Sequence, residues 1–191
     1  MSPQPSVTMY NYRFYSYITL LLNNDKKNKT AVLYNALKNI EPALEDQVNH
    51  IRNNKQWILT NRQNFLLCST SGIYCLFDDD KLLCAGIIEH VQMKRVITLP
   101  LFRLQGHARR LLTEFASQMY RCGLFAYTPA DAFTHPALDR MGWIRNAGRN
   151  EDGTHDYVPP DHVERYKDYY VNIHLDLTKC LRHFEEIGVK C

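Results

Sequence analysis

The stretch that decides the fold reads VITLPLFRLQGHARRLL, residues 96–112. A short apolar run precedes Pro100, and Gly106 follows six residues later. Apolar residues then recur at steps of three and four, at Ala108, Leu111, Leu112, Phe115, Ala116 and Met119. This spacing predicts a helix with one apolar face, which ends near Gly123. The stretch therefore predicts a strand, a tight loop and the N-terminus of a helix.

The predicted loop has the chemistry of an anion site. The first turn of a helix carries N–H groups without intrahelical partners and a partial positive charge. Gly106 lets an anion approach the backbone because it has no Cβ. Arg103, Arg109 and Arg110 add formal positive charge nearby. The expected ligand is a pyrophosphate or a similar anion.

The same stretch resembles the acetyl-coenzyme A loop of the GNAT superfamily of N-acetyltransferases. The family pattern is Arg or Gln, two residues, Gly, one residue, then Gly or Ala, which Arg103, Gly106 and Ala108 match. Pro100 stands where the family usually has a proline, and paired leucines follow at 111 and 112. Residues 135–143 resemble the second signature of the family, with Trp143 in place of Phe. The resemblance covers about residues 82–177, and the first 60 residues match only in the order of elements.

The resemblance implies a fold, a co-substrate and a binding site. The fold is α/β (α+β mixed), with a mixed, mostly antiparallel β-sheet flanked by α-helices on both faces. The co-substrate is acetyl-CoA, and no metal is expected. Backbone groups of Ile97, Thr98 and Leu99 would pair with its pantetheine arm. Its pyrophosphate would bind the loop residues Arg103, Leu104, Gln105, Gly106, His107, Ala108 and Arg109.

Acetyl transfer to an amine needs a base for the amine proton and an acid for the departing thiolate. The chain departs from the family at both positions, since Gln92 stands where the histone-modifying branch has a glutamate and Leu138 where many members have a tyrosine. Glu89 and His90 are near enough in sequence to replace the base. A surface pair at a strand end is the alternative interpretation of these two residues. The candidates for the acid are Tyr127, His135 and Tyr169, and a structural role is the alternative interpretation of each.

Three functions remain open from the sequence. The first is an N-acetyltransferase for an amine on a small molecule or a protein. The second is a catalytically weak or inactive protein of the same fold that binds acetyl-CoA or a partner protein. The third discards the resemblance and leaves an anion-binding interaction domain of another fold.

Length, charge and cysteine content bear on the number of domains, the kind of partner and the cellular compartment. A chain of 191 residues suits one domain, predicted over residues 10–191 after a disordered lead at 1–9. The net charge of +3 does not indicate a nucleic-acid partner, and no apolar run is long enough to suggest a membrane partner. The six cysteines form no C-x-x-C pair, which favours free thiols in a cytoplasmic protein. The partner is an amine acceptor of unknown identity, and a homodimer is left open.

Periodicity predicts the remaining elements. Residues 10–22 alternate as a strand does, and residues 33–51 carry a helical stripe that Pro42 divides. Strands are predicted at 65–68, 73–77, 82–91 and 170–177, with turns at 78–81 and 92–95. Residues 131–140 are predicted to be helical. Residues 146–167 are polar and carry Asp152-Gly153 and Pro159-Pro160, so they are predicted to form a surface loop.

Overall fold

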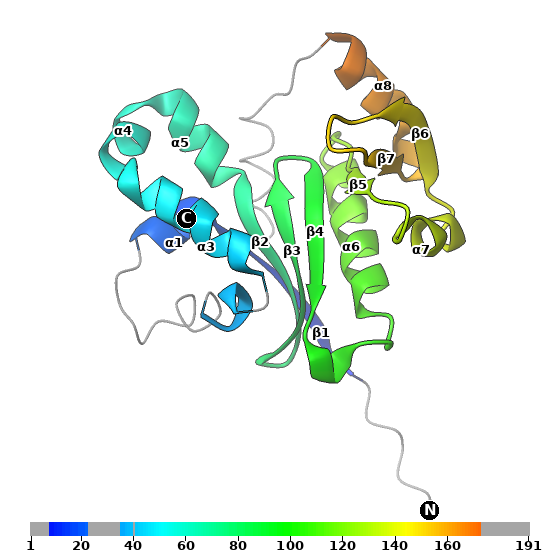
Figure 1. The fold of residues 1–191 in the computed structure, drawn as a ribbon, viewed down its shortest axis with the longest axis horizontal. Helices are drawn as coiled ribbons and strands as arrows, with labels where there is room; N and C mark the ends of the chain where they lie inside the picture. The colour runs from blue at the N-terminus through cyan, green and yellow to red at the C-terminus, as the bar shows by residue number, and fades with distance from the viewer. Residues whose placement is uncertain (1–7, 23–34, 40, 173–191) are drawn as a thin grey trace, which may run out of the picture.

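The computed structural model describes residues 8–22, 35–39 and 41–172, and the structural statements below concern these residues. Its centre is a four-stranded antiparallel sheet in the order β1-β2-β3-β4 (Figure 1). These strands are β1 (Tyr10–Ser16), β2 (Ser71–Asp78), β3 (Lys81–Glu89) and β4 (Gln92–Thr98). A second sheet has the order β5-β7-β6. It contains β5 (Thr128–Ala130), β6 (Ile144–Arg149) and β7 (His155–Val158).

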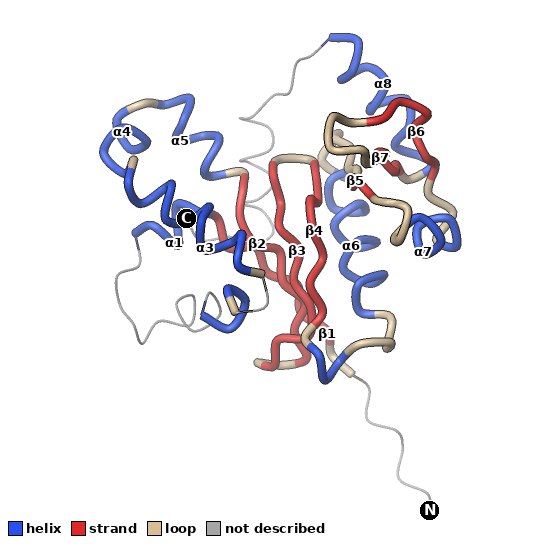
Figure 2. The backbone as a smooth tube through the Cα atoms, viewed as in Figure 1, coloured by secondary structure: helices blue, strands red, loops and turns tan. Residues whose placement is uncertain are grey.

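Helices cover both faces of the central sheet (Figure 2). On one side lie α1 (Tyr17–Leu22), α3 (Pro42–Asn53), α4 (Lys55–Thr60) and α5 (Arg62–Ser69). On the other side lies α6 (His107–Arg121). The shorter elements around the second sheet are α7 (His135–Arg140), η2 (Pro160–His162) and α8 (Val163–Asn172). The predicted class, a mostly antiparallel sheet between two helical layers, is confirmed.

Strand β2 is the centre of the core because both of its faces are buried. Tyr74 and Leu76 belong to the cluster that includes the apolar face of α6. Ile73 and Cys75 belong to the cluster formed with α1, α3 and α4. A strand buried on both sides reads as a nearly continuous apolar run, which is what residues 73–77 show. The sheet therefore couples the two helical layers.

Several local predictions are confirmed. The helix after the glycine ends where expected, with Gly123 at φ 76°. Pro42 begins α3 at a position that proline tolerates. The β2–β3 turn contains Asp79 at φ 52°, as expected for a tight hairpin.

Two predicted strands are wrong in the first half of the chain. The alternating segment 10–22 is a strand only to Ser16, and α1 follows from Tyr17. Residues 65–68 lie in α5 rather than in a strand. Short apolar runs do not distinguish a strand from a helix with one packed face, and here Phe65 and Cys68 pack, partly buried, against the core cluster on the α1, α3 and α4 side.

Two predicted irregular segments are wrong as well. The expected turn at 92–95 is the first half of β4. The expected loop at 146–167 contains the end of β6, all of β7 and the start of α8. Within the expected helix at 131–140, only α7 is helical. Of the predicted strand at 170–177, residues 170–172 are helical and the rest lies outside the described residues, as do residues 1–7 of the expected disordered lead.

Four thiols can be assigned in the described part of the chain. There, Cys68, Cys75, Cys84 and Cys122 form no disulfide bond. Burial raises the pKa of Cys84 to about 11, which keeps it protonated at neutral pH. None of the described helices combines the length and the apolar character that a bilayer crossing requires.

Gly72 provides a test of how closely the end of β1 packs against the start of β2. A Cβ at Gly72 would lie 2.1 Å from the carbonyl oxygen of Tyr15 and 2.7 Å from the Cα of Ser16, both backbone atoms. We expect Gly72→Ala to lower the free energy of unfolding by about 3 kcal/mol, since the backbone has to move apart. The matched control is Gly148→Ala, because its Cβ would meet only the Asn146 side chain, at 3.6 Å. Equal denaturation midpoints for the two variants would contradict this packing.

Candidate functional site

Strand β4 has an open edge, and that edge organises the site. At its start β4 bridges in parallel to residue 127, with Met93 N–H donating to Tyr127 O at 2.9 Å. Tyr127 N–H donates back to Val91 O at 3.1 Å. Residues 128–130 then pair with β7 instead. Among the described strands, β4 beyond Met93 therefore has a ladder partner only on its β3 side.

The antiparallel ladder determines which backbone groups face that edge. Leu99 N–H donates to Leu83 O at 3.1 Å, so this group is engaged with the β3 side. Backbone groups alternate in direction along a strand, which turns those of Thr98 and Val96 away from β3. Thr98 O accordingly accepts a hydrogen bond from Arg103 Nε at 3.4 Å. Of the three residues predicted to pair with a pantetheine arm, Thr98 is the one whose backbone faces outward.

A β-bulge lies at the point where β4 separates from residue 127. Ile87 pairs with Arg95 and Ile88 pairs with Met93, so Lys94 is the extra residue. A bulge bends a strand and redirects the adjacent side chains. The bulge in the β3–β4 ladder therefore lies where β4 diverges from residues 128–130.

The open edge leads into the predicted anion loop. After η1 (Pro100–Phe102), Arg103, Leu104, Gln105 and Gly106 are all exposed. Gly106 caps α6 with φ 79°, a conformation that glycine adopts without strain. The first bond into the helix runs from Arg110 N–H to Gly106 O at 3.1 Å. The N–H groups just before it have no acceptor within the helix, which makes this end of α6 suited to an anion.

Side chains of Tyr10, His107 and Arg110 form a cluster that contacts the loop, and the sequence did not indicate this cluster. Arg110 Nη1 donates to Gln105 O at 2.7 Å and lies 3.2 Å from His107 Nδ1. The guanidinium also sits over the ring of Tyr10, at 4.9 Å from its centroid. His107 is buried against Tyr10, and its pKa is lowered by burial and by Arg110. His107 and Arg110 therefore shape the loop with their side chains, and Arg109 is left exposed as a cation.

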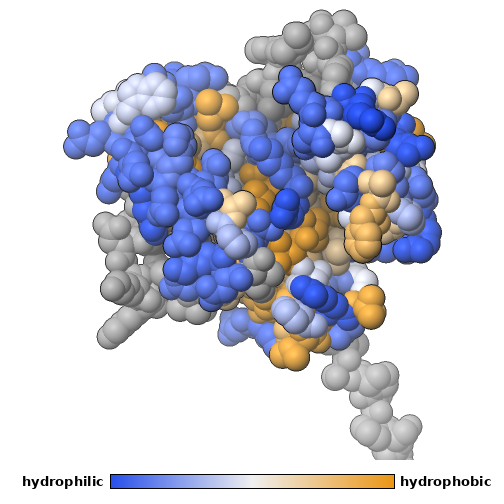
Figure 3. All heavy atoms as spheres, viewed as in Figure 1, coloured by the Kyte–Doolittle hydropathy of each residue, from blue (hydrophilic) through white to orange (hydrophobic). Residues whose placement is uncertain are grey.

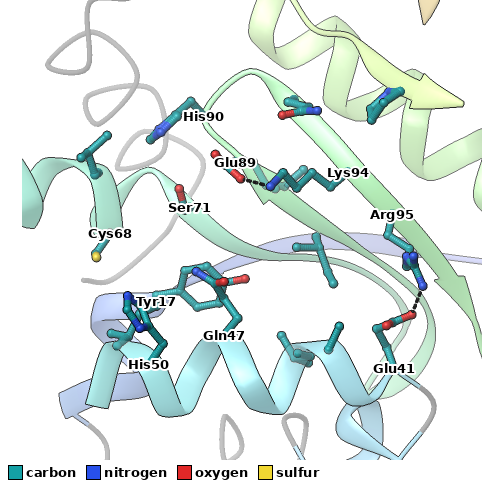
Figure 4. A pocket seen from close by; sticks show the side chains of 18 of the residues that line it. Tyr17, Glu41, Gln47, His50, Cys68, Ser71, Glu89, His90, Lys94 and Arg95 are labelled. Atoms are coloured by element: carbon teal, nitrogen blue, oxygen red, sulfur yellow. Dashed lines mark hydrogen bonds and ion pairs between the residues drawn. The ribbon is translucent and has the colours of Figure 1, made fainter. Parts of the chain in front are cut away.

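Beside the β4 edge lies a cavity of about 1090 Å³ (Figure 4). Its walls come from α3, from α4 and α5, from the β3–β4 turn and from the β6–β7 loop. Glu89 and His90, the two residues predicted from sequence, both line it, and Tyr127 lines it next to the bridge to β4. In the space-filling view, apolar surface lies in the furrow between the α3 side and the β5–β7 side (Figure 3).

His90 is held in an unusual conformation by one neighbour. Its φ is 58°, in the left-handed region that non-glycine residues rarely adopt. Its N–H donates to Thr70 O at 3.0 Å, and its Nδ1 lies 2.6 Å from Thr70 Oγ1. Burial lowers the pKa of His90, while nearby Glu89 raises it and Lys94 lowers it. The ring is therefore neutral at pH 7, which is the form that can accept a proton.

Glu89 is in a different state. Its carboxylate forms an ion pair with Lys94, the bulged residue of β4, and about half of its side chain is exposed (Figure 4). On the same side of the cavity, Arg95 forms an ion pair with Glu41 at 2.6 Å. Glu89 thus already has a cationic partner, whereas His90 has a neutral one.

The position where the resembled family has its acid and the three sequence candidates for the acid lie in different surroundings. Leu138 is buried in the core, so the departure from the family pattern at this position serves packing. His135 is engaged with Ala130 O at 3.0 Å and with Arg145. The side chain of Tyr169 lies outside the described set. Of the two candidates whose side chains are described, Tyr127 lines the cavity and His135 does not.

Charge on the cavity wall is a feature that sequence reasoning missed. The charged lining residues are five carboxylates and two cations: Glu41, Glu89, Glu151, Asp152, Asp156, Lys94 and Arg95. Both cations pair with carboxylates of the α3 and β3 side. The wall is therefore net negative, although the whole chain carries +3. The polar composition of 150–156 was the available signal, but it indicated only a surface loop.

No protein-family model matches the chain, and no curated protein matches it. Solved structures similar to it include the spermidine/spermine N-acetyltransferase of Vibrio cholerae, at 10% identity and a TM-score of 0.49, over 82% of this chain and 98% of that one. The PaiA N-acetyltransferase of Thermoplasma acidophilum, solved with coenzyme A, is similar at 12% identity and a TM-score of 0.44, over 78% of this chain and 97% of that one. The ribosomal-protein-S18-alanine N-acetyltransferase of Escherichia coli is similar at 19% identity and a TM-score of 0.34, over 47% of this chain and 66% of that one.

The environment of His90 predicts how its titration responds to charge. Burial lowers its pKa below the ordinary value of 6.5. Glu89→Gln should lower the pKa of His90 further, because it removes the carboxylate that raises it. Lys94→Met should raise that pKa, because it removes a nearby cation. Histidine-ring NMR titration checks both signs, and shifts of the same sign in the two variants would contradict the assigned surroundings.

Proposed function

We propose that the protein is an acetyl-CoA-dependent N-acetyltransferase that moves an acetyl group to an amine. The observation that carries the proposal is the continuity of three features. The open edge of β4 leads directly into the Gly106 loop, and the same edge borders a cavity that contains a neutral histidine. The first two features suit an extended, pyrophosphate-bearing ligand, and the third suits removal of a proton from an amine.

The residues present fit acetyl-CoA. Outward-facing backbone groups of Val96 and Thr98 can pair with the amide groups of a pantetheine arm, as a neighbouring strand would. The exposed N–H groups near Gly106 and the Arg109 side chain can hold a pyrophosphate. When bound, the thioester supplies an activated acetyl group.

The other residues of the chain act on the amine and on developing charge. His90 accepts the amine proton, directly or through water, because its ring is neutral at pH 7. Backbone N–H groups on the open β4 edge are donors suited to the negative charge that develops on the acetyl oxygen. Tyr127, at the end of that edge, is our candidate for returning a proton to the departing sulfur.

Two features favour His90 over Glu89 as the base. The Glu89 carboxylate is already engaged in an ion pair with Lys94. His90 instead contacts a hydroxyl group through one ring nitrogen. Both residues line the same cavity, which supports a role for them beyond that of a surface pair at a strand end.

The charge of the cavity wall suggests the type of acceptor. A net negative cavity raises the local concentration of cations. An acceptor that carries a further positive group, in addition to the reacting amine, would fit the β6–β7 side of the wall. The identity of the acceptor, a small molecule or a protein amine, is left open by this proposal.

One observation favours a second candidate, a protein that binds acetyl-CoA with little or no catalysis. Leu138 packs in the core where many members of the resembled family have an acidic hydroxyl, and Gln92 cannot act as a base. Coenzyme A thiolate is a fairly good leaving group, so loss of one acid slows transfer without abolishing it. Tight cofactor binding without transfer to any amine would favour this candidate.

Cofactor binding at the loop is tested by Gly106→Val. The φ of 79° at Gly106 makes any side chain there strained. A branched side chain would also take up space at the N-terminus of α6, where the anion is proposed to bind. We expect the Kd for coenzyme A to rise at least tenfold, roughly the loss of one charge-assisted hydrogen bond. The control is Gly142→Val, where φ is 80° and no atom lies within 4 Å, so the strain is matched away from the loop. Titration calorimetry that finds equal affinity in the two variants would show that the loop does not bind the cofactor.

The base assignment is tested by pH–rate profiles. His90→Ala should lower kcat by about 10²–10⁴, whereas Glu89→Gln should change it by less than about tenfold. In the parent, activity should be full at neutral pH and should fall as pH drops through the lowered pKa of His90, since the protonated ring cannot accept a proton. If His90→Ala keeps both the parental rate and the acid limb, the base lies elsewhere.

A further inference from the structure

The contact between His90 and Thr70 joins two elements that are distant in sequence. Thr70 follows α5 and is fully buried, while His90 lies in the β3–β4 turn. Two hydrogen-bonding contacts connect them, from His90 N–H to Thr70 O at 3.0 Å and between Nδ1 and Thr70 Oγ1 at 2.6 Å. The left-handed backbone of His90 shows that this turn is held in place at some conformational cost.

The hydroxyl proton of Thr70 is the basis for assigning a direction to the side-chain bond. The Thr70 hydroxyl has one proton, and it donates this proton to Leu66 O at 2.9 Å, one helical turn earlier. With that proton directed at Leu66 O, Thr70 Oγ1 accepts from the imidazole and Nδ1 carries the ring proton. In a neutral imidazole the other nitrogen, Nε2, is left with its lone pair. This is the nitrogen that can take a proton from an amine or a water molecule.

We infer that Thr70 is a positioning residue that selects the Nδ1–H tautomer of His90 and so presents Nε2 as the proton acceptor. The chain Leu66 O, Thr70 Oγ1–H, His90 Nδ1–H fixes both the orientation of the ring and the location of its proton. The same bond persists when Nε2 takes up a proton, because Nδ1 remains a donor in the imidazolium. Thr70 thereby plays the part that a carboxylate or carbonyl plays behind other catalytic histidines.

The inference rests on the proposed function only in assigning His90 as the base, because the tautomer itself can be observed without catalysis. The test compares Thr70→Val, which keeps the shape and removes the hydroxyl, with Thr70→Ser, which keeps the hydroxyl. The matched control is Thr60→Val on α4. Thr60 makes the same bond to a carbonyl four residues earlier, from its hydroxyl to Gln56 O at 2.8 Å, and it does not line the cavity.

The first measurement is the ¹⁵N–¹H correlation spectrum of the histidine rings in the unliganded protein at neutral pH. We expect the His90 proton on Nδ1 in the parent, in Thr70→Ser and in Thr60→Val. In Thr70→Val we expect a detectable population with the proton on Nε2. A parent protein with the proton on Nε2, or a Thr70→Val variant that keeps it wholly on Nδ1, would overturn the inference.

The second measurement is the rate of acetyl transfer. Thr70→Val should lower kcat by about three- to tenfold, the expected effect of one neutral hydrogen bond, with the Kd for coenzyme A unchanged. Thr70→Ser should restore most of the rate, and Thr60→Val should not lower it. If the spectra agree with the expectation but His90→Ala transfers as fast as the parent, the proposed base is wrong while the assignment of Thr70 stands. If Thr70→Val alters the tautomer without lowering kcat in a protein whose rate depends on His90, the positioning role is overturned.

Discussion

The open edge of β4 is the constraint on which the rest of the site depends. Backbone donors and acceptors require partners. A strand that loses its neighbour on one side therefore presents a row of unpaired donors and acceptors on that side. Here the single bridge between Gln92 and Tyr127, together with the bulge at Lys94, ends the pairing on that side. Residues 128–130 pair with β7, so within the described part of the chain the outward backbone groups of Val96 and Thr98 have no strand partner, and Thr98 O is contacted only by the exposed Arg103 side chain. The site is therefore a consequence of sheet topology before any side chain is considered.

The two helical layers place the Gly106 loop and the cavity next to that edge. On one face, α6 packs on the sheet through Leu111, Phe115 and Met119, which fixes its N-terminus at the end of β4. On the other face, α3 and α5 form a wall of the cavity, and the Glu41–Arg95 ion pair joins α3 to β4. Because β2 is buried on both sides, the anion loop and the cavity are positioned by the same strands. The Gly106 loop and the cavity thus lie on the same sheet.

Sequence reasoning succeeded where the determining interactions are local. The strand, the glycine and the helix after it are specified within residues 96–123, by periodicity and by a glycine at positive φ. It failed at residues 65–68 because a short apolar run fits a strand and a buried helix equally well. It failed at 146–167 because the turn signals there mask β7, whose Asp156 and Tyr157 are buried by tertiary contacts. Glu89 and His90 could be suggested from their place in the chain, but the Thr70 contact that distinguishes them joins residues 20 positions apart and requires the fold.

The most direct test of the account is a crystal structure of the protein with coenzyme A. The account predicts that the pantetheine arm lies along β4 and exchanges hydrogen bonds with the backbone of Val96 or Thr98. It also predicts that the pyrophosphate lies at the N-terminus of α6 beside Gly106, and that the sulfur lies at the end of the cavity lined by Tyr127 and His90. Coenzyme A bound away from the β4 edge, or with its pyrophosphate outside residues 103–109, would contradict the central claim.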